Sequence, residues 1–198
     1  ITMCKMLKED VRTSHIPIIL LTAKDSLQDK EEGYQVGADS YLTKPFSATL
    51  LHSRINNLLE SRKRLAERLN TNTPHHNMDE KRALLADSLN KLDNEFLEKI
   101  NRLIEDRLSS EKIDIGYLAD NMCMSKSTLY RKMKALTGLS TNEYVRKIKM
   151  QYAERLLLEG RYNVSEIAFR VGINSVVYFR QCFKEEFGVL PSDYLKQP

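Results

Sequence analysis

The sequence predicts a mainly helical protein that begins with a partial α/β segment. Two observations carry this prediction. A pattern of small, apolar and polar residues occurs twice between residues 113 and 188, each time in the order helix, tight turn, helix. The first 60 residues instead alternate strand-like and helix-like stretches, which is the order of a parallel α/β sheet.

The front of the chain contains two predicted strands. Residues 16–23, IPIILLTA, are a continuous apolar run of strand length, typical of a strand buried on both faces, and a shorter strand is expected within 38–46. Helices are expected at 24–37 and 48–69, and residues 1–9 look like the end of a preceding helix. Two strands do not form a stable sheet alone. We therefore expect this front to be partly disordered, to pack against another copy, or to reflect where the sequence was cut.

The predicted helix over 48–69 leads into the connecting part of the chain. Its apolar residues fall on heptad-like positions that Arg62 interrupts, so it could pair with its twin in a dimer or pack only on its own sheet. Residues 70–79 are polar and contain Pro74, which indicates a linker. A further helix is expected over 84–108, with its early part either a dimer contact or a lever, or simply part of a core.

The repeated unit is defined by matching residues at nearly constant spacing. Ala119 matches Ala168 at an offset of 49, and Gly138 matches Gly188 at an offset of 50. One extra residue in the second turn explains the change, so we interpret the region as a duplicated helix-turn-helix. Further matches are Met122 with Val171, Ser125 with Ser175, Leu129 with Phe179, Met133 with Phe183, and Lys134 with Lys184.

Each second helix has a predicted cap, a buried stripe and an exposed face. Ser125 and Ser175 are candidate N-caps, with Asn174 as a competing choice. The stripe residues stand four apart: Leu129 and Met133, then Phe179 and Phe183. The exposed faces could enter a major groove, where Arg and Gln read base edges while Lys and Ser hold phosphates. The candidate DNA-contacting residues are Ser125, Lys126, Ser127, Tyr130, Arg131 and Lys134, followed by Asn174, Ser175, Val176, Val177, Tyr178, Arg180, Gln181 and Lys184.

A strong helix is predicted between the two copies. Ser140 and Glu143 form a capping box, and Gly160 follows the last apolar residue as a C-terminal cap. About 18 helical residues span roughly 27 Å, whereas successive major grooves on one face of DNA lie ~34 Å apart. With a recognition helix beyond each end, such a rod could serve two adjacent grooves.

The net charge of +4 is concentrated in the repeat region. Residues 1–110 hold 17 basic and 17 acidic residues, whereas residues 111–198 hold 14 and 10. Between Ser125 and Met150 there are seven basic residues and a single acid, Glu143. This basic run predicts a phosphate-binding footprint over the first recognition helix and the start of the rod.

The remaining composition excludes several classes of protein. Cys4, Cys123 and Cys182 are odd in number and far apart, which favours free thiols in a reducing cytosol over disulfides or zinc. The four histidines have no partner at metal-ligand spacing, so we expect surface or linker roles and no metal. No run of ~18 apolar residues or secretory signal occurs. We expect a cytoplasmic segment without membrane contact, whose full-length parent could be anchored in the inner membrane.

Residues 93–196 resemble the DNA-binding domain of AraC-type transcription regulators. The residues that carry this resemblance are LAxxM at 118–122, VGINSxxYF at 171–179, FKEEFG at 183–188 and PSDYL at 191–195. The resemblance implies that both recognition helices contact DNA. Val176 and Val177 depart from the polar base-readers often found there, so we expect less sequence readout from the second copy.

The front resembles the carboxyl-terminal half of a response-regulator receiver domain, which has a flavodoxin-like fold. LTA at 21–23 and GADSYLTKPF at 37–46 carry the resemblance. It implies that Thr22 follows the phosphoryl group, that Tyr41 is the aromatic switch, and that Lys44 is the cation at the phosphoryl site. It also implies a cis peptide bond between Lys44 and Pro45.

The acidic half of a receiver site is missing from this sequence. No paired acids and no phosphoacceptor Asp follow an apolar strand in residues 1–50, and Asp39 precedes its strand. Thr22, Tyr41 and Lys44 are therefore vestigial unless the missing half is supplied elsewhere. We expect no cofactor here, because Mg²⁺ belongs only to an intact receiver.

The resulting hypothesis is a sequence-specific transcription regulator, the output part of a two-component phosphorelay like the tail of hybrid two-component proteins. Its expected domains are a truncated receiver over 1–60, a helical linker over 61–90 and an AraC-type domain over 91–198. Expected partners are double-stranded DNA, a second copy in a homodimer and, as a further candidate, RNA polymerase. The alternative is a protein-interaction or dimerisation module without specific DNA binding. Enzyme activity is not expected, because neither Cys123 nor Cys182 has a setting that lowers a thiol pKa.

Overall fold

The computed structural model describes residues 1–23, 26–70, 90–109 and 113–195, and these gather into two compact units. The helices α5 and α7 each contribute residues to both units. Of the described residues, the first unit comprises 1–23, 26–70, 90–96 and 131–138, and the second comprises 97–109, 113–130 and 139–195.

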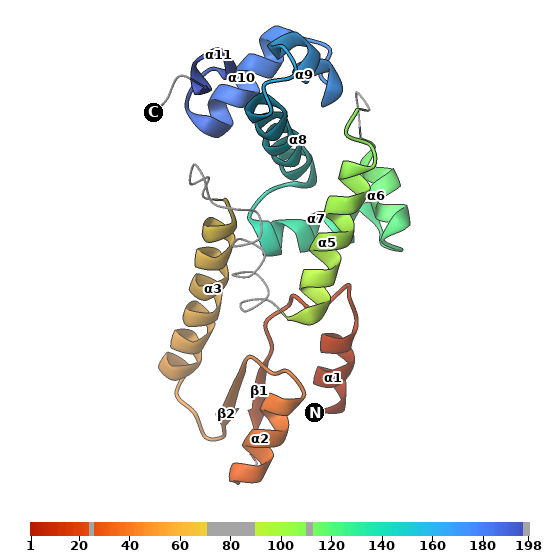
Figure 1. The fold of residues 1–198 in the computed structure, drawn as a ribbon. Helices are drawn as coiled ribbons and strands as arrows, with labels where there is room; N and C mark the ends of the chain where they lie inside the picture. Colours follow the sequence, from red (N-terminus) through yellow and green to blue (C-terminus); the bar gives the residue numbers. More distant parts are fainter. Residues whose placement is uncertain (24–25, 71–89, 110–112, 196–198) are drawn as a thin grey trace. The chain divides into compact units, whose positions relative to one another are not determined.

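After a first helix, the first unit follows the order strand, helix, strand, helix that the sequence predicts. After α1 (Thr2–Glu9) come β1 (Ile19–Thr22), α2 (Leu27–Gln35), β2 (Ser40–Thr43) and α3 (Ala48–Asn70). The two strands pair in parallel, with Ile19 opposite Ser40 and Thr22 opposite Thr43 (Figure 1). The first strand is shorter than the apolar run 16–23, because Pro17 has no N–H to donate to a ladder.

The crossover helix α2 lies directly against the second strand. A Cβ added at Gly33 would lie 2.8 Å from the ring of Tyr41, closer than side-chain atoms approach. Tyr41 and its neighbour Leu42 are buried. A glycine is therefore required at residue 33, because only a residue without a Cβ lets the helix approach this closely.

Asp39 ties four segments of the first unit together. Its carboxylate accepts from the Lys8 ammonium at 2.6 Å, from the backbone N–H of Ile18 at 2.8 Å and from the Arg62 guanidinium at 3.4 Å. These contacts join α1, the start of β1 and α3 to the start of β2. Arg62, which interrupts the apolar pattern of its helix, thus fastens that helix to the sheet.

The predicted repeats lie in the second unit, except for residues 131–138 of the first repeat, which belong to the first unit. The first helix of this part is α5 (Lys91–Glu105), so the predicted linker 70–79 and the early part of the predicted helix 84–108 fall almost wholly outside the described residues. The helices that follow are α6 (Ile115–Asn121), α7 (Lys126–Thr137), α8 (Thr141–Leu158), α9 (Val164–Arg170), α10 (Val176–Phe187) and α11 (Pro191–Tyr194).

The rod α8 has both predicted ends. The Ser140 hydroxyl accepts from the backbone N–H of Glu143 at 3.3 Å, and the Glu143 carboxylate accepts from the backbone N–H of Ser140 at 2.7 Å. This reciprocal pair is the predicted capping box. At the other end Gly160 has a left-handed φ of 67°, as a helix-terminating glycine should.

Side chains fasten the rod to α5. The Tyr144 hydroxyl donates to the Asn101 side chain at 2.9 Å, and Arg155 pairs with Glu105 at 3.8 Å. Burial raises the pKa of Tyr144 to about 12, so its hydroxyl stays protonated and keeps donating. The helix α5 therefore supports the helix-turn-helix part of the chain.

One apolar core holds the second half of this unit together. Ala153 of α8, Ala168 of α9 and Phe183 of α10 are all completely buried in it. Phe183 also makes an edge contact with Tyr194 of α11, with ring centroids 5.5 Å apart. Small residues at 153 and 168 allow the helices to approach closely, as the sequence predicts for Ala168.

The cysteines are free thiols, and one histidine differs from expectation. Cys4 and Cys182 are buried and Cys123 is exposed. His15, expected on the surface or in a linker, is only 8% exposed. Within the described residues no helix is long and apolar enough to span a bilayer.

Candidate nucleic-acid interface

The two helix-turn-helix units have the same backbone geometry in their turns. Cys123 and Gly172 are both left-handed, with φ of 53° and 65°. The next backbone N–H, of Met124 or Ile173, donates to the carbonyl of Ala119 or Ala168 at 2.9 Å in each case. The units therefore correspond at an offset of 49 as far as Ile173. The inserted residue of the second copy is Asn174.

Serine caps both second helices. The Ser125 hydroxyl accepts from the backbone N–H of Thr128 at 3.1 Å, and the Ser175 hydroxyl accepts from that of Tyr178 at 3.2 Å. Ser175 and not Asn174 is thus the N-cap of α10. Each cap fixes where its recognition helix begins, and so which side chains its first turn presents.

The back of each recognition helix is buried as predicted. Leu129 and Met133 in α7, like Phe179 and Phe183 in α10, are almost completely excluded from solvent. Because residues four apart lie on one face of a helix, each helix is held by one apolar stripe. The opposite face is left for a partner.

The predicted DNA-contacting residues lie on those outward faces, with one difference. Val177 is 77% exposed, and Tyr178 is exposed as well. Val176 is half-buried and packs against the apolar core of the second unit. The other predicted residues are all exposed: Ser125, Lys126, Ser127, Tyr130, Arg131, Lys134, Asn174, Ser175, Arg180, Gln181 and Lys184.

The basic run between Ser125 and Met150 is only partly a surface feature. Lys132, Lys147 and Lys149 are buried. Lys147 pairs with Glu186 at 3.8 Å, and the Lys149 ammonium donates to the carbonyl of Gly172 at 3.4 Å. These lysines fasten the rod to the second helix-turn-helix. The exposed members of the run are Lys126, Arg131, Lys134 and Arg146.

Tyr178 is held in its place on the outward face of α10. Its hydroxyl interacts with the thiol of Cys182 and with Arg146 of the rod. The hydrogen bond with Cys182 is the largest influence and raises the pKa of Tyr178. The hydroxyl therefore remains a neutral donor at physiological pH.

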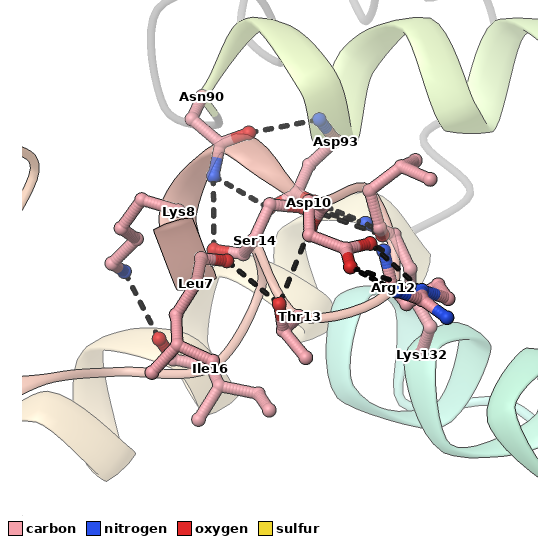
Figure 2. A network of polar contacts seen from close by, with 11 residues as sticks. Leu7, Lys8, Asp10, Arg12, Thr13, Ser14, Ile16, Asn90, Asp93 and Lys132 are labelled. Atoms are coloured by element: carbon pink, nitrogen blue, oxygen red, sulfur yellow. Dashed lines mark hydrogen bonds and ion pairs between the residues drawn. The ribbon is translucent and has the colours of Figure 1, made fainter. Parts of the chain in front are cut away.

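Lys132 is a residue of the first recognition helix that the sequence pattern did not single out. Its side chain is fully buried and its ammonium pairs with Asp93 at 2.5 Å (Figure 2). Burial lowers the pKa of Lys132, and the hydrogen bond that its ammonium donates to Asp93 opposes that shift. A signal was present in the sequence, because Lys132 stands in the apolar stripe with Leu129, Met133 and Leu136.

Two of the three receiver residues, Thr22 and Lys44, lie at the carboxyl end of the two strands. Thr22 ends β1, and its carbonyl accepts from the backbone N–H of Lys44 at 2.7 Å. The Lys44–Pro45 peptide bond is cis, as predicted. Tyr41 is buried. Thr22 and Lys44 are thus neighbours, as a phosphoryl site requires.

The acids of this part do not fit a magnesium site. Asp39 is occupied by Lys8, Ile18 and Arg62. Among the described residues no group of three or more His, Cys, Asp or Glu side chains is placed to hold a metal ion.

The paired units define a class of protein. Two helix-turn-helix motifs with buried backs and exposed polar fronts, joined by an 18-residue rod, are the architecture of a double-stranded-DNA-binding domain.

Comparisons with family models and curated proteins agree with this class. Residues 118–197 match the model of a helix-turn-helix domain, and residues 1–56 match that of the response regulator receiver domain. The chain thus joins a segment similar to a receiver domain to a segment similar to a helix-turn-helix domain.

Three curated relatives cover different parts of the chain. Histidine kinase P4 of Formosa agariphila is 36% identical over 192 residues, which are 97% of this chain and 14% of that protein. The dual transcriptional regulator Rns of Escherichia coli is 32% identical over 50% of this chain and 37% of its own length. The heme response regulator HssR of Staphylococcus saprophyticus is 50% identical over 29% of this chain and 25% of its own. The chain spans a minor part of each relative.

Proposed function

We propose that this chain recognises specific DNA sequences as the output part of a two-component phosphorelay protein. The observation that carries the proposal is the contrast between the two faces of each recognition helix. In both helices an apolar stripe is buried, while arginine, lysine and hydroxyl side chains lie exposed on the other side. Such a face suits base edges and phosphates.

Each recognition helix would enter one major groove. Arg131 in α7 and the pair Arg180 and Gln181 in α10 have the donors to read base edges. Lys126 and Lys134 would hold phosphates, as would Lys184. The rod is ~27 Å long at ~1.5 Å per residue, and recognition helices beyond its ends would reach grooves ~34 Å apart.

The receiver segment would regulate DNA binding and would carry out no phosphoryl chemistry by itself. Thr22 and Lys44 are neighbours, but the acids that hold Mg²⁺ and accept phosphate are not among residues 1–50. The segment could serve phosphoryl signalling only with a receiver half from elsewhere in a longer protein. We infer that Mg²⁺ belongs to that complete receiver.

Dimerisation through α3 is part of this proposal. Ile55 and Leu59 are exposed apolar residues on that helix, which is 23 residues long. A second copy of the chain could cover them in a paired helix. RNA polymerase is a further candidate partner, and the cytoplasm is the compartment in which such a segment would meet DNA.

We infer that the chain itself is not an enzyme. The relative that matches 97% of this chain is named a histidine kinase, but this chain corresponds to 14% of that protein. Of the three thiols, Cys4 and Cys182 are buried, where a nucleophile would not meet a substrate.

Selection of bound sites from a random duplex pool at near-physiological salt tests the proposal. The expected result is enrichment of sites with two short boxes about one helical turn apart. Binding without enrichment, lost steeply as salt rises, would leave only nonspecific phosphate contacts. Absence of binding at any salt would contradict the proposal and favour the protein-interaction alternative.

A further inference from the structure

The ammonium of Lys132 is surrounded by three acceptors inside the first unit (Figure 2). It donates to the carbonyl of Val11 at 2.5 Å, to the hydroxyl of Ser14 at 2.8 Å and to the carboxylate of Asp93 at 2.5 Å. An ammonium has three donor hydrogens, so all of them are used. The cation also lies 4.7 Å from the ring centroid of Phe96. These partners fix the nitrogen in one place.

The acceptors are themselves held by one another. The Ser14 hydroxyl donates to the carboxylate of Asp93 at 2.7 Å. The Asn90 amide donates to the same carboxylate at 2.8 Å and to the carbonyl of Ser14 at 3.2 Å. Ser14, Asp93 and Lys132 are all completely buried. A buried polar network whose members are satisfied specifies one arrangement of the segments that form it.

Three segments meet in this network. Val11 and Ser14 belong to the connection between α1 and β1 of the receiver segment, and Asp93 lies in the first turn of α5. Lys132 belongs to the first recognition helix and lies 121 residues after Val11. The receiver segment therefore touches the element that is proposed to read DNA.

The network holds the back of the recognition helix. Tyr130 and Lys134 stand two residues to either side of Lys132, and at ~100° per residue that separation is ~200° around the helix. Both are exposed, whereas Lys132 is buried. The contact therefore leaves the outward face open. The equivalent residue of the second copy, Cys182, lies in an apolar core instead.

We propose that Lys132 is a positioning residue that couples the receiver segment to the first recognition helix. Three bonds from the receiver connection and α5 converge on one nitrogen, so displacement of residues 11–14 must move or release α7. The state of the receiver thereby sets the orientation in which α7 meets DNA. This inference rests on the proposed function for its DNA readout but not for the coupling itself.

Hydrogen exchange of the full chain without DNA tests the coupling. Ser14→Ala removes one acceptor from the receiver side and keeps the ion pair, and Lys132→Met removes the cation at nearly constant length. Each is expected to speed amide exchange about tenfold both at residues 11–15 and at residues 131–137, because a hydrogen bond to a charged group is lost. Lys134→Ala, an exposed change on the same helix, should alter neither segment. If Ser14→Ala affects only its own connection and leaves α7 unchanged, the coupling is wrong.

DNA binding supplies the second readout. In a selected two-box site, the box that loses contacts with Arg131→Ala is the one read by α7. Ser14→Ala should weaken binding about tenfold to a duplex that keeps only that box, and leave binding to the other box unchanged. Equal losses at both boxes would indicate general destabilisation and overturn the positioning role. If the wild-type chain binds no duplex, the proposed function fails, while hydrogen exchange still decides the coupling.

Discussion

Cys123 and Gly172 occupy equivalent positions in the two helix-turn-helix units and share a left-handed backbone, with φ of 53° and 65°. The fold requires this conformation at both places, because the following N–H must reach back to Ala119 or Ala168. A glycine adopts it without a steric cost, whereas a residue with a Cβ is strained by ~1–2 kcal/mol. The first turn is therefore held in place by its surroundings.

Cys123→Gly is expected to raise the free energy of unfolding by about 0.5–1 kcal/mol. Relief of the left-handed strain exceeds the greater chain entropy that glycine adds to the unfolded state. Urea unfolding followed by circular dichroism measures the change. Cys123 is exposed, so little packing is lost.

Gly160→Ala is the matched control for that experiment. Gly160 has φ 67°, and a Cβ there would meet nothing within 4 Å. The substitution isolates the conformational cost and should destabilise the protein by about 1 kcal/mol. A loss of stability in Cys123→Gly as well would show that the thiol makes contacts that outweigh the strain.

Local patterns predicted the repeats and their caps because each depends on residues close in sequence. The capping box of Ser140 and Glu143 needs only a spacing of three, and the stripe of Phe179 and Phe183 a spacing of four. The burial of Lys132 depends instead on a distant partner, because its ammonium donates to the carbonyl of Val11, 121 residues earlier. No local pattern contains that partner, so a buried lysine in an otherwise apolar stripe had no explanation in the sequence.

Partners far away in sequence also explain why Lys147, Lys149 and Val176 are less exposed than the sequence predicts. Lys147 and Lys149 count toward a basic surface when only charge is considered, but Glu186 and the carbonyl of Gly172 hold them inside. Val176 reads as part of an exposed face, yet it packs on the apolar core of the second unit. A position on a helix wheel does not reveal how far the neighbouring helices extend over it.

Arg131→Ala should reduce affinity for the selected site by ~1–3 kcal/mol and relax preference at one base position. Arg131 is exposed on α7 and has the bidentate donors that suit guanine. Fluorescence anisotropy with the selected site and its single-base variants measures both effects. A loss that is equal for every sequence would make Arg131 a phosphate contact.

Lys134→Ala is the comparison for Arg131→Ala, because both residues lie on the exposed face of α7. An ammonium that neutralises a phosphate should contribute equally for all sequences. Its removal is expected to reduce the slope of log affinity against log salt by ~1. A change in base preference with an unchanged salt slope would contradict the assignment.

Val177→Ala should remove a preference for thymine in the box read by α10. The side chain is 77% exposed, and an apolar group of this kind suits the thymine methyl. Replacing that thymine by uracil removes the methyl from the DNA side. Either Val177→Ala or the uracil replacement alone should weaken binding by roughly 0.8 kcal/mol. Once one of the two changes has been made, the other should weaken binding little further. Additive losses would mean that the two groups do not touch.

Val176→Ala separates packing from readout at the neighbouring position. Val176 packs against the apolar core of the second unit, so this variant should lose ~0.5–1.5 kcal/mol of stability. Its preference for thymine over uracil should remain that of the wild type.

His15 should make the chain less stable in mild acid. Burial lowers the pKa of His15 from 6.5 to about 4; Lys132, Arg62 and Lys8 influence it in the same direction, and Asp93 opposes them. Above pH 6.5 the ring is neutral in both the folded and the unfolded chain, and it contributes no pH dependence. As the pH falls from 6.5 toward 4, only the unfolded chain takes up the proton, so the free energy of unfolding falls.

His15→Gln removes this titration and reveals its size. Between pH 7.5 and pH 5 the wild type should lose about 1–2 kcal/mol more stability than the variant, since a full pKa unit corresponds to ~1.4 kcal/mol. Urea unfolding at pH 7.5, 6.0 and 5.0 measures the difference between the two proteins. Carboxylates elsewhere, such as Asp10 with its pKa lowered to about 2 by the side-chain hydrogen bond from Arg12, titrate equally in both proteins and cancel. Parallel stability curves for wild type and variant would show that His15 takes up its proton in the folded state as readily as in the unfolded chain.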